Sequence, residues 1–244
     1  MKLPSIKVQL SLFLGLFAAY LAFIEKDFLF PLAIFIAILF SVVSDTLINY
    51  LKNKKITVTE SSIVTGLIIG YVLSSQESWL ILALASIFAI VSKHVIRFRK
   101  SHIFNPAALG IFIVVLLFGA YTEWKTAYSW YILVPLGIYF ASRIKRLSLI
   151  ASFFITSLFL YGPQAFLYNV SLLDIFGYLN YFFIFVMMIE PRTTPVRRRS
   201  KILFGMGVAA FIFAFYEFGV SLEVELYALL GANFLGALLE RRRS

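Results

Sequence analysis

The chain has 244 residues, of which 61% are hydrophobic and only 14% are charged. Soluble domains carry about 25% charged residues, so this composition excludes an ordinary soluble enzyme and indicates an integral membrane protein. A net charge of +10 would suggest nucleic acid binding in a soluble protein. In a membrane protein it marks cytoplasmic loops instead, so we expect no nucleic acid partner. The absence of cysteine excludes disulfides, thiol catalysis and cysteine-ligated iron–sulfur clusters within this chain.

Apolar segments follow one another along the whole chain, and a membrane-crossing helix needs about 20 apolar residues. The segments are 8–24, 28–50, 57–74, 78–96, 104–122, 127–142, 147–162, 173–189, 201–218 and 221–240. They predict an all-α integral membrane protein with about ten transmembrane helices, the first being a retained helix rather than a signal peptide. We interpret 1–244 as a single membrane domain with a first five-helix half, 8–122, and a second, 127–240. An odd number of helices per half gives the halves opposite orientations, so we expect two inverted repeats.

Basic residues occur at every second gap between these segments. Of the 22 Lys and Arg residues, all but Lys26 and Lys125 lie in these alternate gaps, within a few residues of them, or at the chain ends. Short loops rich in Lys and Arg stay cytoplasmic, so the pattern predicts a multi-pass protein of the cell membrane with both termini in the cytoplasm. Basic loops beside a membrane also attract anionic lipid, which makes membrane lipid an expected partner.

A basic, aromatic stretch precedes the fifth segment and reads SKHVIRFRKSHIFNPAALG, residues 92–110. Asn105 is a favourable N-cap and Pro106 fits a first helical turn, so we expect this helix to begin at Pro106. The unpaired N–H groups of a helix start attract a phosphate or another anion. Lys93, Arg97 and His102 add positive charge or hydrogen-bond donors to this candidate binding site. The alternative is an ordinary capped helix after a cytoplasmic loop.

A second polar motif, MMIEPRTTPVRRRSK, occupies residues 187–201. Glu190 lies where an apolar segment ends, and a carboxylate at the membrane boundary is a functional candidate. Thr193 and Thr194 supply hydroxyl groups in the turn that follows. The alternative is a structural salt bridge from Glu190 to Arg192 or to a basic residue of a neighbouring loop.

The third polar motif, TVTESSIVTGLIIG, opens the third segment at residues 57–70. Ser62 and Thr65 are its candidate binding residues, while Gly66 and Gly70 have the spacing of a tight helix-packing face. The alternative is a packing helix with a polar cap. The predicted topology places all three motifs at the cytoplasmic face, where they could form a pocket for an anionic, aromatic ligand.

Few other ionisable residues lie within the apolar segments. Asp45 is inside the second segment, where it either pairs with a basic residue or belongs to an ion path. We interpret His94 as a hydrogen-bonded residue near the interface. No His, Asp and Glu residues have metal-site spacing, and we find no nucleophile–base pair, Walker loop or dinucleotide fingerprint. The sequence therefore assigns neither catalytic residues nor metal ligands.

The chain resembles a family of flavin-carrying membrane proteins that the sodium-translocating NADH:quinone reductase and the Rnf electron-transport complex share. The matching motifs are SSIVTG, KSHIFNPAALG and Glu190-Pro191-Arg192-Thr193-Thr194-Pro195. The resemblance implies two inverted five-helix repeats, similar to urea and ammonium channels, and flavin held in the membrane. Larger members attach FMN to a Thr of an S-G-A-T motif. The nearest string here, Gly119-Ala120-Tyr121-Thr122, has one residue too many.

The resemblance thus implies a non-covalent flavin, FMN or riboflavin, near the cytoplasmic face. Its binding residues would be Ser62, Thr65, Lys93, Arg97, His102, Asn105, Pro106, Glu190, Thr193 and Thr194. The protein would be a subunit of an electron-transfer system, with or without ion coupling, rather than a stand-alone enzyme. Expected partners are a cytoplasmic flavin or iron–sulfur reductase, other membrane subunits and quinone. The alternative function is a channel or transporter for a small solute or ion with a urea-channel-like fold.

Overall fold

The computed structural model describes residues 4–98, 101–126, 129–220 and 223–241. The basic residues Lys2, Arg99, Lys100, Arg242 and Arg243, used above to predict the topology, lie outside the described residues. The chain forms two compact units. Unit 1 consists of Met1–Arg97 and Pro106–Lys125, and unit 2 consists of Phe98–Asn105 and Thr126–Ser244. The boundary therefore lies near the predicted midpoint, except that one short segment of the first half belongs to unit 2.

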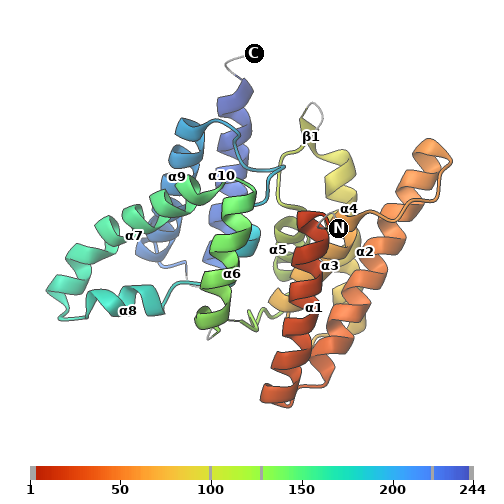
Figure 1. The fold of residues 1–244 in the computed structure, drawn as a ribbon, viewed down its shortest axis with the longest axis horizontal. Coiled ribbons are helices and arrows are strands. Elements are labelled where there is room, and N and C mark those ends of the chain that lie inside the picture. The colour runs from red at the N-terminus through yellow and green to blue at the C-terminus, as the bar shows by residue number, and fades with distance from the viewer. Residues whose placement is uncertain (1–3, 99–100, 127–128, 221–222, 242–244) are drawn as a thin grey trace. The chain divides into compact units, whose positions relative to one another are not determined.

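Unit 1 is built from five helices whose apolar faces pack on one another (Figure 1). They are α1 (Ile6–Glu25), α2 (Leu29–Asn53), α3 (Glu60–Val72), α4 (Trp79–Val95) and α5 (Pro106–Phe118). Helix α2 packs against both α3 and α4, α1 packs against α3, and α4 packs against α5. As predicted, α5 begins at Pro106. Each of the five predicted segments of the first half overlaps one of these helices, although α1 and α2 extend beyond the predicted bounds by up to three residues.

Local capping residues explain where three of these helices begin. The hydroxyl of Ser5 accepts a hydrogen bond from the N–H of Val8, and Ser78 caps α4 in the same way. Thr59 accepts from the N–H of Ser62, so α3 begins at Glu60, three residues after the start of the predicted segment. Each cap satisfies a backbone donor that the helix itself leaves unpaired.

The predicted small-residue face of α3 packs directly on α2. A Cβ atom added to Gly66 would lie 2.5 Å from Ile38 Cα, and one added to Gly70 would lie 2.7 Å from Ile34 Cα. Both distances are too short for any larger side chain, so the two backbones touch because glycine is present. The prediction that Gly66 and Gly70 form a tight packing face is confirmed.

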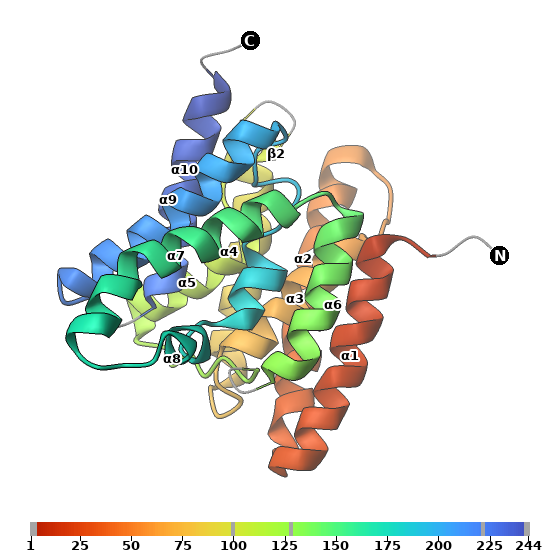
Figure 2. The ribbon, with the colours of Figure 1, turned by 60° about the vertical axis from the view of Figure 1, so that its left-hand side comes forward.

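Unit 2 contains helices of very different length, from the six residues of α8 to the 21 residues of α7, and one broken segment. Its helices are α6 (Trp130–Arg143), α7 (Leu147–Leu167), α8 (Leu172–Gly177), α9 (Arg198–Glu217) and α10 (Val224–Arg241), and the π-helix η1 spans Phe183–Met187. Helices α7 and α9 pack side by side, α10 packs on α9, and α6 packs on η1 (Figure 2). A two-stranded hairpin, β1 (Arg97–Phe98) and β2 (Ser101–His102), precedes Asn105.

The prediction of one continuous helix over 173–189 is wrong. The segment forms the short α8 and then η1, with the residues 178–182 between them. Asn180 explains the new start, because its side-chain oxygen accepts a hydrogen bond from the N–H of Phe183 at 3.0 Å. The residues of η1 are buried inside the protein. Their hydrophobicity is therefore explained by packing against other residues and does not require contact with lipid.

The helical architecture agrees with a multi-pass membrane protein. Among the described residues, α1, α2, α7 and α9 are each long and apolar enough to cross a membrane, and shorter apolar helices include α3, α4 and α5. At about 1.5 Å per residue, the 13 residues of α3 span roughly 20 Å, less than a bilayer core of about 30 Å. The count of ten crossings and the inverted repeat remain predictions.

Loops at one end of unit 1 enclose the side chain of Lys125. Its Nζ atom lies 2.7 Å from Asp27 Oδ2 and 3.7 Å from Glu25 Oε2, and it also contacts the carboxylate of Glu123. Asp27 additionally accepts a 2.6 Å hydrogen bond from Ser75. One cation thus joins the α1–α2 loop, the loop after α3 and the α5–α6 loop.

The pKa values of this cluster follow from opposing effects. Burial by itself raises the pKa of Asp27, but hydrogen bonds from Lys125 and Ser75 and the positive charge of Lys125 outweigh it, so the pKa lies below 3.8. Burial by itself lowers the pKa of Lys125, but hydrogen bonds to Asp27 and Glu123 and their negative charges hold it above 10.5. Both groups are therefore ionised at neutral pH.

Candidate functional site

A buried arginine organises the loop that follows η1 in unit 2. The guanidinium of Arg146, at the start of α7, donates hydrogen bonds to the carbonyl oxygens of Pro195 at 2.8 Å, Pro191 at 3.1 Å and Thr194 at 3.4 Å. Three carbonyls of one loop thus converge on one planar donor group. The loop 190–195 has a defined shape although it contains no regular helix or strand.

Glu190 and His102 meet within this unit, although 88 residues separate them in the chain. His102 Nε2 lies 3.1 Å from Glu190 Oε1, and the hydroxyl of Thr193 donates to Glu190 Oε2 at 3.4 Å. The hydroxyl of Thr194 donates to the backbone oxygen of Glu190 at 2.8 Å. The side-chain partner of Glu190 in a neighbouring loop is therefore His102, and not Arg192, which was the other partner considered from the sequence.

A pair of asparagines connects the segment before α5 with α10. The backbone N–H of Asn105 donates to Asn233 Oδ1 at 2.9 Å, and Asn105 Nδ2 donates to the carbonyl oxygen of Met187 at 3.1 Å. Asn233 Nδ2 donates in turn to the carbonyl oxygen of Thr193 at 3.3 Å. Both asparagines are buried, so these bonds hold β2, the end of η1 and α10 together.

A cavity of about 390 Å³ opens beside these contacts. Its aromatic and basic lining comes from Phe98, His102 and Arg192, and its hydroxyl groups come from Ser101, Thr193 and Thr194. Arg192 forms no hydrogen bond or ion pair with another residue in the described part of the chain. The cavity thus combines an aromatic ring, hydroxyl groups and the guanidinium of Arg192. It is large enough for a small ligand, since such sites measure about 300–1,000 Å³.

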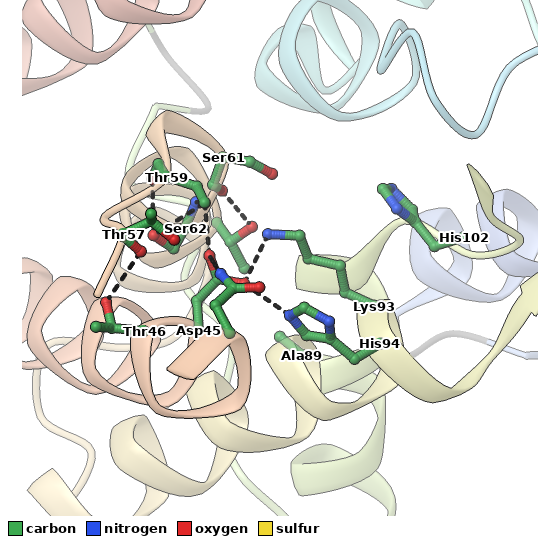
Figure 3. Close-up of polar contacts among 12 residues, drawn as sticks. Asp45, Thr46, Thr57, Thr59, Ser61, Ser62, Ala89, Lys93, His94 and His102 are labelled. Carbon is green, nitrogen blue, oxygen red and sulfur yellow. Dashed lines mark hydrogen bonds and ion pairs between the residues drawn. The ribbon is translucent and has the colours of Figure 1, made fainter. Parts of the chain in front are cut away.

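A second polar cluster lies in unit 1, around the buried carboxylate of Asp45 on α2 (Figure 3). Lys93 Nζ lies 3.0 Å and His94 Nε2 2.8 Å from Asp45 Oδ1. The hydroxyl of Thr59 donates to Asp45 Oδ2 at 2.6 Å. We name Asp45, Thr59, Lys93 and His94 the Asp45 cluster. It ties α2, α3 and α4 together, which agrees with the ion-pair interpretation of Asp45.

The predicted binding residues thus divide between the two units. His102, Asn105, Glu190, Thr193 and Thr194 come together in unit 2, around the cavity and the asparagine pair. In unit 1, Lys93 is engaged by Asp45, the hydroxyl of Ser62 donates to the Thr59 carbonyl, and that of Thr65 donates to the Ser61 carbonyl. Pro106 is the first residue of α5, and Arg97 is exposed on β1. The convergence of all three motifs on one ligand remains a prediction.

Two residues of the site are not found by sequence reasoning. Arg146 belongs to a basic run that indicates only membrane topology, yet its side chain is buried and holds the loop. Asn233 lies well inside an apolar segment, and nothing in the sequence pairs it with Asn105. The position of Asn233 could have indicated a role, since an amide within an apolar helix needs a hydrogen-bond partner.

Comparison with known proteins connects this architecture to a family. The model of the NQR2, RnfD, RnfE family matches residues 4–139. The chain belongs to this family. The match includes the polar opening of α3 and the segment from His102 to Pro106, and it ends before Glu190. A comparison with curated proteins found no match.

Family membership confirms the resemblance expected from the sequence and gives the protein a general role. The chain is a multi-pass membrane protein, and the family indicates a membrane subunit of an electron-transport complex that contains other membrane subunits. The family match covers His102 but ends before the loop around Glu190. In the structure, that loop nevertheless packs against His102.

Proposed function

We propose that the chain is a membrane subunit of a flavin-dependent electron-transfer system and that it binds flavin non-covalently in the cavity between β2, the loop 190–195 and α10. The cavity itself carries this proposal, because it combines Phe98, His102, two threonine hydroxyls and the guanidinium of Arg192 around about 390 Å³. Electrons would arrive from a cytoplasmic flavin or iron–sulfur reductase and leave toward quinone or another carrier.

The lining of the cavity suits the chemistry of a flavin. An isoalloxazine ring needs an aromatic or apolar surface, which Phe98 supplies. It also needs hydrogen-bond partners. The hydroxyls of Thr193 and Thr194 donate to Glu190, and their oxygen atoms can accept a hydrogen bond from a flavin N–H. FMN also carries a phosphate, and Arg192 can bind it as a charge-assisted partner. When bound, the flavin supplies the electron-transfer chemistry, and the protein supplies position and electrostatic field.

The residues around the cavity would hold the bound flavin in a constant position. Glu190 holds the His102 ring through its 3.1 Å contact, and Arg146 holds the backbone that carries both threonines. Because both supports are buried or partly buried, we expect the cavity to keep its shape when the ligand leaves. We therefore assign Arg192 and the threonines to binding, and Arg146 and Glu190 to positioning.

A transport function would depend most directly on Asp45 as a ligand on an ion path. In the structure, Lys93, His94 and Thr59 occupy both oxygens of its carboxylate. A carboxylate with three close partners is a structural element rather than an open ion ligand. The geometry therefore supports the redox function better.

The decisive experiment compares the binding of FMN and riboflavin, which differ by one phosphate. We expect the protein purified in detergent to release yellow flavin on acid precipitation, or to take up added FMN when isolated without it. Replacing Arg192 by Gln should weaken FMN binding by about tenfold or more and riboflavin binding much less, measured by quenching of flavin fluorescence.

Arg197→Gln is the matched control, because Arg197 follows the same loop but does not line the cavity. It should leave both affinities unchanged. Failure of the intact chain to bind either flavin would contradict the proposal. Equal weakening of FMN and riboflavin by Arg192→Gln would contradict the role of Arg192 as the phosphate partner.

A further inference from the structure

A second cavity, of about 400 Å³, lies elsewhere in unit 2. It is enclosed by α7, the break between α8 and η1, α9 and the first turn of α10. It shares no lining residue with the proposed flavin cavity. Its size is also within the range of about 300–1,000 Å³ that small-molecule sites occupy. The family relationship and the proposed function assign nothing to it.

Aromatic rings dominate the wall of this second cavity. They belong to Phe153, Tyr161, Tyr178, Phe183 and Tyr216. Tyr161 packs edge-to-face on Phe213 with ring centroids 5.1 Å apart, which restrains the plane of its ring. The faces of aromatic rings carry negative charge density and attract cations, most strongly where water is excluded.

Glu225 is the only carboxylate of this lining, and it lies in the first turn of α10. Within the described part of the chain, it forms no ion pair and no hydrogen bond with another side chain. The buried carboxylate of Asp45, by contrast, has both a lysine and a histidine beside it.

A carboxylate in an apolar wall is unfavourable unless a cation or several donors compensate it. An inorganic cation would need several oxygen ligands, and no group of three metal-binding side chains exists among the described residues. A lipid chain or a neutral ring would leave Glu225 without a partner. A cation with an apolar body satisfies both the carboxylate and the aromatic wall.

We infer that this cavity binds a small organic cation, a quaternary or protonated amine with apolar substituents, through Glu225 and the surrounding rings. The carboxylate neutralises the charge of the ligand, while Tyr161 and Tyr216 contact its alkyl groups. This inference does not depend on the proposed flavin site, because the two cavities are lined by different residues.

The test compares choline with its uncharged isostere, the dimethylbutanol in which a carbon atom replaces the nitrogen. Binding to the full chain in detergent is measured by calorimetry. We expect choline to bind about tenfold more tightly than the alcohol, because only the cation interacts with Glu225 and the ring faces. Equal binding, or binding of the alcohol alone, would show an apolar gap for lipid and would overturn the inference.

Two variants connect the binding to this cavity. Glu225→Gln should reduce choline affinity by about tenfold and leave the alcohol unaffected. Glu217→Gln is its control, since Glu217 is hydrogen-bonded to Gln164 at an exposed position outside the cavity. Unchanged choline affinity in Glu225→Gln would refute the inference.

The aromatic wall is tested separately. Tyr161→Phe keeps the ring and should keep most of the affinity, whereas Tyr161→Leu removes it and should weaken choline several-fold. If both bind choline like the unmodified chain, the ring has no part in the site. Should a variant fail to fold, the comparison of choline with its isostere on the unmodified chain still decides the question.

Discussion

At the residue scale, buried charges determine how this protein holds its polar segments in place. Arg146 donates hydrogen bonds to three backbone carbonyls of the loop 190–195. Asp45 has the opposite arrangement, a carboxylate surrounded by side-chain donors. Arg146 connects the start of α7 to a loop, and Asp45 connects helices. Burying such charged groups is unfavourable unless they are hydrogen-bonded.

Replacing Arg146 by Gln should destabilise the loop that carries Thr193 and Thr194. The change leaves buried carbonyl groups without donors, at about 1–3 kcal/mol each before relaxation. We expect a lower thermal unfolding temperature and faster tryptic cleavage within Arg192–Arg199. The control is Arg143→Gln, an exposed arginine of the same basic run. Equal effects of the two substitutions would contradict the loop-holding role.

The Asp45 cluster predicts strong coupling between Asp45 and Lys93. Asp45→Asn leaves the Lys93 ammonium buried without its anion, which should reduce the free energy of unfolding by about 3–5 kcal/mol. The double variant Asp45→Asn with Lys93→Met removes both charges and should be more stable than Asp45→Asn alone. Thermal unfolding of the four proteins in one detergent measures this cycle. Additive losses would show that the pair is not coupled.

At the element scale, short loops as well as helix faces connect the helices of unit 1. Asp27 accepts hydrogen bonds from the N–H groups of Leu29 and Phe30 at the start of α2, and it also binds Lys125. Helix faces meet through Gly66 and Gly70, whereas the helix ends meet through Lys125. The same five helices are thus connected at their faces by close contact and at one end by charge.

The Lys125 cluster predicts a defined pH window for its stabilising effect. The pKa of Asp27 is lowered in the folded protein, so its contribution is present above pH 3.8 and is lost as the pH falls through the lower folded value. The pKa of Lys125 is raised, so its contribution is complete below pH 10.5 and is lost as the pH rises through the higher folded value.

Lys125→Met should therefore lower the unfolding temperature most between these two limits. At pH values outside these limits, the ion pairs of Lys125 are absent from the unmodified protein as well. The difference in unfolding temperature between the two proteins should therefore shrink. Unfolding temperatures of the two proteins, recorded across the pH range in a non-ionic detergent, check this. A difference that stays constant with pH would mean that Lys125 stabilises through packing alone.

At the scale of the whole molecule, the alternating basic loops predict one orientation in the membrane. Gln76, in the turn before α4, should lie outside, and Ser142, beside the basic loop after α6, should face the cytoplasm. Because the chain has no native cysteine, Gln76→Cys and Ser142→Cys each introduce a unique thiol. A membrane-impermeant maleimide should label Gln76→Cys in intact cells, and Ser142→Cys only after permeabilisation. The reverse pattern would invert the topology.

The helices and the family could be recognised from the sequence because their signals are local. Hydrophobic runs located the helices of unit 1, Pro106 marked the start of α5, and the glycine spacing of α3 predicted its packing face. Each signal depends on residues within a few turns of one another. The break in the eighth segment could not be predicted in this way. The segment is hydrophobic throughout, as a continuous helix would be, and the hydrogen bond from Phe183 to the Asn180 side chain marks a new start within it.

The sequence by itself therefore determined a helical membrane protein, its family and the residue types available for a binding site. Only the tertiary structure decided which of them meet: Asp45 with Lys93, His102 with Glu190, and Asn105 with Asn233, a pair 128 residues apart. The physical reason is that hydrophobicity and capping act between neighbours in the chain. The partner of a buried polar group is set by the packing of distant helices, on which no local pattern depends.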